Sequence, residues 1–359
     1  MKILLLSCNI GEGHNAAASA IEFALQSRGI QCRTIDVLTC LSPKISRFIC
    51  NWHTRIYKYM PGLSDVCYCA AERKLGVYRK ISPVYRFLAL GAKNLEKTLT
   101  AGNYNGVVCT HIFGALMMTG VRNRKLADVP CFFVATDYGV TPMLDLCDME
   151  GYFIPAEDLK SEFLRLGISD EKLIASGIPV HQEFHKAGNR ENARKNLNLP
   201  PDWPVVLLMC GSLGCGPIRK IAKRIRKELP EEATLVVICG RNERLFVSMS
   251  DLEGPGIRVL GFSREIARYM DAADLIVTKP GGLSATEAAN KHLPMVFLNT
   301  VGGCEERNFE RFINRGYAWG SKAPEQVVRL AVQLVENPQA RSRMAAFLGR
   351  DFVRNSALI

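Results

Sequence analysis

Short apolar runs, each followed by a turn and a helix-forming segment, recur along the whole chain. In the first half these runs are residues 3–8, 30–38, 106–109, 130–136 and 151–154. In the second half they are residues 205–209, 234–239, 257–260, 274–278 and 294–298. Strands that alternate with helices in this way form mainly parallel sheets with helices on their faces. The sequence therefore predicts an α/β fold in both halves.

The length of the chain and a polar break near its middle predict two domains. The chain has 359 residues, and a domain of this class has about 150 residues. A polar stretch at residues 186–198 is followed by Pro200 and Pro201, which is typical of a linker. We expect an N-terminal domain at residues 1–185 and a C-terminal domain at 186–359, with the last helix packing back on the first domain. Two doubly wound, Rossmann-like sheets of this kind would face each other across a cleft, and ligands bind beyond the carboxyl ends of such strands.

Composition and cysteine usage favour a folded cytoplasmic protein. Apolar residues make up 48% of the chain and charged residues 23%, which is ordinary for globular proteins and excludes disordered and fibrous classes. The 13 cysteines are odd in number, contain no Cys-x-x-Cys pair and mostly lie in apolar runs, as Cys8 and Cys109 do. They are typical of reduced thiols. The first apolar run is too short for a secretory signal, and no later run reaches the roughly 18 apolar residues of a membrane span.

The positive charge of the chain is concentrated in one segment. The formal net charge is +11, which favours an anionic partner. Residues 41–100 contain eleven lysines and arginines against three acidic residues, and eight aromatic residues lie among them. Three interpretations fit this pattern: a membrane-surface patch, a solvated helical face, or a site for single-stranded nucleic acid. The residues of the membrane-surface interpretation are Trp52, Arg55, Lys58, Arg73, Lys74, Arg79 and Lys80.

A glycine turn after the first apolar run carries a histidine. Gly11, Gly13 and Ala16 have the spacing G-x-G-x-x-A, and Asp36 follows 20 residues after Ala16, so a dinucleotide site has to be considered. Any tight turn that leads into a helix needs such glycines as well. His14 falls in the first helical turn, where the helix dipole disfavours the imidazolium form and leaves a neutral base. A histidine at this position can equally serve to satisfy backbone groups.

Three further polar turns lie in the second half. Gly211 to Gly214 follow a buried strand and precede a helix, which suits phosphate oxygens, but the Gly-Lys-Ser/Thr ending of an ATP-binding P-loop is absent. Residues 279–287 form a second glycine turn, with Glu287 one turn inside the next helix. Residues 302–308 place another carboxylate and an amide at a helix start. Singly, each carboxylate is also an ordinary partner of the helix dipole. Together these turns favour a nucleotide diphosphate attached to a polyhydroxylated group.

Seven short motifs, taken in order, resemble a known family. They are GEGH at 11–14, TDYG at 136–139, SGIPV at 176–180, CGRN at 239–242, GF at 261–262, KPGGLSATEA at 279–288 and GCEERN at 303–308. At these residues the chain resembles the family 28 glycosyltransferases of GT-B fold, specifically the monogalactosyl- and processive glucosyl-diacylglycerol synthases. The likeness covers nearly the whole chain.

The resemblance implies a role for each domain and for single residues. The N-terminal domain would take diacylglycerol at the membrane surface, with His14 as the catalytic base and Gly13, His111 and Asp137 on the acceptor side. The C-terminal domain would hold the UDP-sugar. Its implied donor-binding residues are Gly211, Ser212, Leu213, Gly214, Phe262, Ser263, Gly281, Gly282, Leu283, Ser284, Glu287, Glu305 and Asn308. The family commonly has Gln where this chain has Cys304, which leaves the identity of the sugar open.

The implied reaction is an inverting transfer of glucose or galactose from a UDP-hexose to diacylglycerol, in glycolipid biosynthesis. We expect no cofactor and no bound metal, because the chain has no Asp-x-Asp pair. The expected partners are the UDP-hexose, diacylglycerol and an anionic lipid surface, without nucleic acid. The expected location is the cytoplasm, peripheral to the inner face of the cell membrane.

Three alternatives stay open at this point. The same fold can glycosylate a polyprenyl-linked peptidoglycan precursor. A nicotinamide oxidoreductase is allowed by Gly11, Gly13, Ala16 and Asp36 but leaves the second nucleotide-type domain without a role. A nonenzymatic basic binding protein is supported by charge alone.

Overall fold

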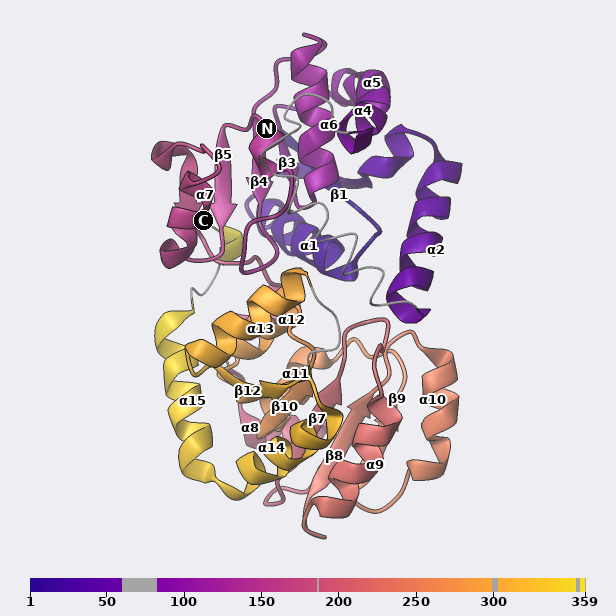
Figure 1. Cartoon of the computed structure of the whole chain (residues 1–359), viewed down its shortest axis with the longest axis vertical. Helices are drawn as coiled ribbons and strands as arrows, with labels where there is room; N and C mark the ends of the chain where they lie inside the picture. Colours follow the sequence, from indigo (N-terminus) through magenta and orange to yellow (C-terminus); the bar gives the residue numbers. More distant parts are fainter. Residues whose placement is uncertain (60–82, 186, 299–302, 353–355, 359) are drawn as a thin grey trace. The chain divides into compact units, whose positions relative to one another are not determined.

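The chain forms two compact units (Figure 1). The computed structural model describes residues 1–59, 83–185, 187–298, 303–352 and 356–358, and for residues 53, 54 and 56–59 it describes the backbone alone. Among the described residues, the N-terminal unit runs to Gln182 and includes residues 303–304 and 356–358, and the C-terminal unit comprises residues 183–185, 187–298 and 305–352. The division lies three residues before the domain boundary predicted from the sequence.

The N-terminal unit is built on six parallel strands in the order β2-β1-β3-β4-β5-β6. The strands are β1 (Lys2–Ser7), β2 (Gln31–Asp36), β3 (Gly106–Cys109), β4 (Cys131–Val134), β5 (Gly151–Ile154) and β6 (Leu173–Ala175). The helices are α1 (Glu12–Gln26), α2 (Pro43–Tyr59), α4 (Pro83–Leu88), α5 (Ala92–Gly102), α6 (Ile112–Asn123) and α7 (Lys160–Leu164). The interior strand β1 pairs with β2 and β3, and its Leu4, Leu5 and Leu6 are fully buried. This buried strand leads into the glycine turn and His14.

The C-terminal unit repeats this architecture with the order β12-β11-β10-β7-β8-β9, again all parallel. Its strands are β7 (Val205–Met209), β8 (Thr234–Ile238), β9 (Ile257–Leu260), β10 (Leu275–Thr278), β11 (Met295–Leu298) and β12 (Ala318–Ser321). Its helices are α8 (Arg190–Asn196), α9 (Ile218–Glu228), α10 (Glu243–Met249), α11 (Ile266–Ala272), α12 (Gly282–Asn290), α13 (Cys304–Asn314), α14 (Pro324–Glu336) and α15 (Pro338–Asp351). Strands β7, β8, β10 and β11 are buried along their whole length, which explains their unbroken apolar sequences.

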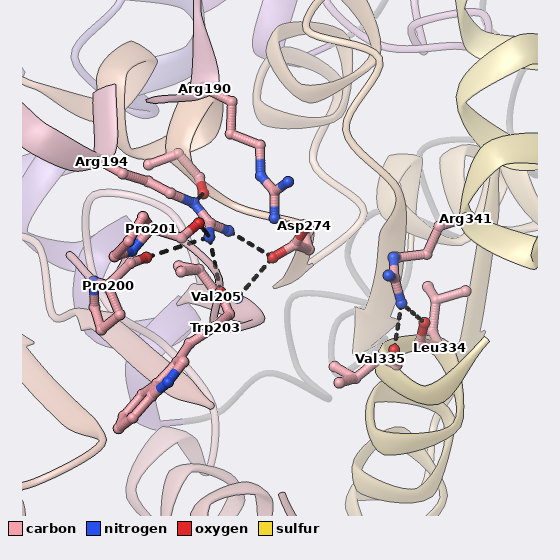
Figure 2. Close-up of polar contacts among 11 residues, drawn as sticks. Arg190, Arg194, Pro200, Pro201, Trp203, Val205, Asp274, Leu334, Val335 and Arg341 are labelled. Carbon is pink, nitrogen blue, oxygen red and sulfur yellow. Dashed lines mark hydrogen bonds and ion pairs between the residues drawn. The ribbon is translucent and has the colours of Figure 1, made fainter. Parts of the chain in front are cut away.

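A buried arginine joins the amino-terminal ends of β7 and β10 (Figure 2). Arg194 of α8 is 1% exposed and donates through Nη2 to the carboxylate of Asp274, at 2.8 Å. The same guanidinium donates to the backbone carbonyls of Pro200, Pro201, Trp203 and Ala272. Asp274 also accepts from the backbone N–H of Val205, at 2.7 Å. One side chain thus anchors the starts of two central strands whose far ends carry polar turns.

The C-terminal residues divide between the two units. Helix α15 packs against α12 and α14 within the C-terminal unit. The last described turn, η8 (Ser356–Leu358), contacts α1 of the N-terminal unit, and the Ser356 hydroxyl donates to the carbonyl of Ile178 at 2.7 Å.

The strands predicted from apolar runs are confirmed, with small shifts at their ends. The predicted strand at 30–38 ends at Asp36, because the Asp36 carboxylate accepts from the N–H of Leu38 and begins the short 3-10 helix η1 (Val37–Cys40). Strands β6 and β12 were not predicted from the sequence. Both lie at the edge of their sheets; β6 has only three residues, and the sequence of β12, AWGS, is not a continuous apolar run.

Candidate active site

The carboxyl ends of three neighbouring strands hold the ring of His14. His14 is the third residue of α1, which starts after β1 with Gly11 in extended conformation as its N-cap. Thr110 follows β3 and Thr136 follows β4, the next strands in the sheet. His14 Nδ1 lies 2.8 Å from the carbonyl oxygen of Thr110 and 2.9 Å from the hydroxyl oxygen of Thr136. Contacts from segments about 100 residues away therefore orient the ring.

These contacts determine which ring nitrogen carries the proton. A carbonyl oxygen can only accept a hydrogen bond, so Nδ1 of His14 is the donor and carries the hydrogen. The lone pair of the neutral ring is then on Nε2. A Cβ on Gly11 would lie 4.0 Å from Nε2, so glycine at that position keeps this side of the ring open.

Burial disfavours the imidazolium form of His14. It lowers the pKa of His14 below the usual value, against the opposing effects of the Asp137 carboxylate and the Thr110 carbonyl, which both favour the imidazolium. The start of α1 also disfavours a cation. A neutral histidine with a free Nε2 lone pair is a general base.

The acceptor-side residues inferred from the resemblance lie around this ring. His111 is N-cap of α6, where its Nδ1 accepts from the N–H of Phe113 at 3.1 Å, and its ring meets that of His14 edge to face at 4.5 Å. Gly13 precedes His14 in the first turn of α1, and Asp137 is half-buried after β4. The contacts of Thr110 and Thr136 with His14 were not predicted from the sequence. The only indication in the sequence was that Thr136 belongs to the TDYG motif.

Asp36, the acidic residue of the possible dinucleotide site, is hydrogen-bonded within the N-terminal unit. The Asp36 carboxylate accepts hydrogen bonds from the N–H of Leu38, the hydroxyl of Ser46 and the side-chain amide of Asn9. It caps η1, so the pattern G-x-G-x-x-A followed by an acid does not identify a ribose contact here.

In the C-terminal unit, the predicted phosphate loop is a tight glycine turn. Gly211 and Gly214 have φ of 68° and 53°, in the left-handed region that favours glycine. The N–H of Gly214 donates to the carbonyl of Gly211 at 3.2 Å, and the Ser212 carbonyl accepts from the N–H of Arg241 at 2.8 Å. A Cβ on Gly214 would lie 2.5 Å from the Cys239 carbonyl oxygen. The turn of residues 211–214, with Ser212 and Leu213 at its tip, is thus packed against the turn that follows β8.

The second residue after β9 is an exposed phenylalanine. Phe262 is 55% exposed, and the guanidinium of Arg241 lies 5.2 Å from its ring centroid. The hydroxyl of the next residue, Ser263, accepts from the N–H of Glu265 at 3.1 Å. An exposed ring beside a cation suits the stacking of a planar base.

The turn after β10 contacts helix α13 through polar side chains. The Lys279 ammonium forms an ion pair with the Glu305 carboxylate, and the Asn308 amide donates to the Pro280 carbonyl at 2.9 Å. Gly281 is the N-cap of α12, and Gly282, Leu283 and Ser284 form its first turn. Glu287 lies one turn further, where burial and the negative charge of Glu183 raise its pKa to about 8. Lys279 is the first residue of the KPGGLSATEA motif, and no role was predicted for it from the sequence.

Of the predicted membrane-surface residues, two are described in full. Trp52 of α2 is 56% exposed, and its ring stacks with that of Phe48, 68% exposed, at 6.4 Å between centroids. Arg55 is also exposed. The side chain of Lys58 and the whole of Arg73, Lys74, Arg79 and Lys80 lie outside the described residues. In the part of the chain that the structure describes, no helix has the length and apolar character needed to cross a membrane.

Family models match both units of the chain. Residues 14–180 match the family model of monogalactosyldiacylglycerol (MGDG) synthase, and residues 205–347 match the model of the glycosyltransferase family 28 C-terminal domain. The processive diacylglycerol beta-glucosyltransferase of Staphylococcus saprophyticus is 24% identical over 350 residues, which is 96% of this chain and 87% of the relative. The enzyme of the same name from Staphylococcus aureus is 22% identical over 98% of this chain and 89% of its own length.

Solved structures show the same fold at lower identity. MurG of Acinetobacter baumannii has a TM-score of 0.65 at 16% identity and covers 99% of this chain and 96% of its own. MnaA of S. aureus, solved with UDP, has a TM-score of 0.66 at 14% identity over 99% and 93% of the two chains.

Two parallel sheets with polar turns at their carboxyl ends, and the match of each unit to a transferase model, define a glycosyltransferase of GT-B fold. The N-terminal unit belongs to the monogalactosyldiacylglycerol synthase family and the C-terminal unit to the family 28 glycosyltransferases.

Proposed function

We propose that this glycosyltransferase moves a hexose from a UDP-sugar to the free hydroxyl of diacylglycerol, with inversion at the anomeric carbon. Two facts support the substrates: the staphylococcal relatives are named diacylglycerol glucosyltransferases, and the structural neighbour MnaA binds UDP. The observation that carries the chemistry is the contact of His14 Nδ1 with the Thr110 carbonyl oxygen, which orients the ring.

In the proposed reaction His14 is the general base. Its Nε2 takes the proton of the diacylglycerol hydroxyl as that oxygen attacks the anomeric carbon. The bond from this carbon to the UDP oxygen breaks, and its electron pair leaves with UDP. Thr110 and Thr136 position the base, since they accept from Nδ1–H and so keep the lone pair on the opposite nitrogen.

The C-terminal unit is the proposed donor site. Uracil would lie against Phe262 and the backbone of Ser263, and the diphosphate would bind the backbone of residues 211–214. Glu287 would contact the ribose hydroxyls. Glu305 would contact the sugar, together with Asn308 one turn further along α13.

The proposed acceptor side includes a membrane surface. Helix α2 exposes the aromatic pair Phe48 and Trp52 close to the exposed Arg55. Aromatic side chains beside cations favour the headgroup boundary of anionic lipid. We propose that the protein docks in this way at the inner face of the cell membrane, where diacylglycerol is available.

A product assay tests the proposal. Vesicles that contain diacylglycerol are offered UDP-glucose or UDP-galactose in parallel, with a polyprenyl-pyrophosphoryl sugar as the competing acceptor. We expect a glycosyl-diacylglycerol product, and His14→Ala should lower turnover by about 10²- to 10⁴-fold, the usual contribution of a general base. Thr136→Ser, which keeps the hydroxyl, should retain more activity than Thr136→Val.

Three results would contradict parts of this proposal. Transfer to the polyprenyl acceptor alone would favour the peptidoglycan alternative. An unchanged rate in His14→Ala would remove His14 as the base. Failure to use any UDP-sugar would exclude the donor class.

A further inference from the structure

The ammonium group of Lys279 lies between the two glycine turns of the C-terminal unit. Lys279 follows β10 directly. A Cβ built on Gly211 or on Gly281 would lie 3.9 Å from Lys279 Nζ in both cases, and one on Gly211 would lie 3.0 Å from its Cε. Both turns therefore lack side chains at the points where they approach this lysine. The cation is adjacent to the backbone of the turn that is proposed to bind phosphate.

The partner of Lys279 is the carboxylate proposed to contact the sugar. Lys279 Nζ forms an ion pair with Glu305 Oε1, and the two side chains are 21% and 8% exposed. Removing two charges from water is costly, and a buried ion pair is often no more stable than apolar residues of the same volume. Such a pair therefore calls for a reason other than stability.

The ion pair is not required to hold α13 against the turn after β10, because a hydrogen bond already joins these two segments. The Asn308 amide of α13 donates to the carbonyl of Pro280, at 2.9 Å, and Asn308 is fully buried. This bond already ties α13 to the turn after β10. The ion pair is therefore not needed to connect these two segments; what it adds is a positive charge at this position.

We propose that Lys279 binds the diphosphate of the sugar nucleotide and stabilises it as the leaving group, while Glu305 holds the ammonium in place until the nucleotide arrives. This inference rests on the proposed UDP-sugar donor. A diphosphate offers several anionic oxygens to the ammonium, where Glu305 offers one carboxylate, so the ligand competes for the cation. Glu305 is then released to accept hydrogen bonds from sugar hydroxyls.

The chemical step needs no proton at this end of the donor. When the bond between the anomeric carbon and the phosphate oxygen breaks, the electron pair stays on that oxygen and adds negative charge to UDP. The three N–H groups of Lys279 donate to the diphosphate and stabilise this charge. The lysine stays protonated throughout.

Calorimetric binding of uridine, UMP and UDP to the full chain tests the inference. In Lys279→Met we expect UDP affinity to fall by about 10- to 100-fold, the usual effect of losing a hydrogen bond to a charged group. Uridine affinity should change less than about threefold, since no phosphate is present. Glu305→Gln should bind UDP more tightly than the wild type, because the anion that competes for the ammonium is gone.

A matched control separates this effect from general electrostatics. Lys220 of α9 also pairs with a glutamate, Glu325, but its side chain is 59% exposed. Lys220→Met removes the same charge from the same unit and should leave the affinities for all three ligands unchanged.

The outcomes distinguish this inference from the proposed function. If the wild type binds UDP and Lys279→Met keeps the wild-type ratio of UDP to uridine affinity, the lysine has a structural role and the inference is wrong. If the wild type binds no uridine nucleotide, the donor proposal fails together with it. If Lys279→Met does not fold, Glu305→Gln decides: weaker or unchanged UDP binding in that variant overturns the inference.

Discussion

Replacing the buried Arg194 should destabilise the C-terminal unit far more than replacing its exposed neighbour Arg190. Both side chains pair with Asp274, at 2.8 Å and 2.6 Å, but they are 1% and 51% exposed (Figure 2). In Arg194→Met, Asp274 loses its buried partner and the backbone carbonyls that accept from the guanidinium lose their donor. Removing one member of a buried pair costs about 3–5 kcal/mol. Arg190→Met loses an exposed pair and should cost about 0–1 kcal/mol.

Hydrogen exchange at Val205 measures this difference locally. Its N–H donates to Asp274 at the start of β7, in the middle of the sheet. A loss of about 3–5 kcal/mol corresponds to exchange that is faster by about 10²- to 10³-fold or more. A local probe is preferable because a chain with two units need not unfold in one transition. UDP affinity at low temperature should be preserved, since the arginine lies at the strand ends opposite the glycine turns.

Two results would refute this reasoning. If Val205 exchanges equally fast in Arg194→Met and Arg190→Met, burial does not govern the contribution of the pair. If Arg194→Lys is as stable as the wild type, a single charge is sufficient and the several carbonyl contacts of the planar guanidinium add nothing.

Three further predictions concern the site. The Asp137 carboxylate favours the imidazolium form of His14, so Asp137→Asn should lower the pKa of His14 further. The acid limb of the pH profile of kcat/KM should then move to lower pH. An acid limb that stays in place would mean that a group other than His14 titrates there. Gly214→Ala should lower UDP affinity by about tenfold, because alanine is strained at φ 53° and its Cβ would meet the Cys239 carbonyl. The control is Gly29→Ala, which has a positive φ in open space and should affect stability alone. The wild type should sediment with anionic vesicles in a manner that depends on salt and lipid charge, and Trp52→Ala should weaken this sedimentation. Indifference of the wild type to both salt and lipid charge would favour a solvated helix face.

Local sequence patterns were sufficient for the central strands and for the position of His14. Strands β7, β8, β10 and β11 are buried on both faces, so their sequences are continuous apolar runs with a clear length. Helix α1 starts at Glu12, which places His14 in its first turn as the sequence predicted. The glycine turns were recognisable because left-handed backbone needs glycine whatever surrounds it.

Contacts between distant segments were not predictable in the same way. The pair G-x-G-x-x-A and Asp36 satisfied a dinucleotide spacing, yet Asp36 caps η1 and binds Ser46 and Asn9. Lys279 and Arg194 had no special sequence signal, since a lysine in a turn and an arginine on a short helix are ordinary surface residues. Each of these two side chains is distinguished by its burial and by an ion pair with a residue far away in the sequence.

The amino-acid sequence alone determined the two α/β halves, the glycine turns at their strand ends and the residue types available for chemistry, because hydrophobic periodicity and glycine backbone freedom act over a few neighbouring residues. The tertiary structure alone decided the tautomer and the orientation of the candidate base. Thr110 and Thr136 reach His14 only after parallel pairing has brought β1, β3 and β4 side by side. The properties of an imidazole depend on the groups within hydrogen-bonding distance of its ring, and folding selects those groups from distant parts of the chain.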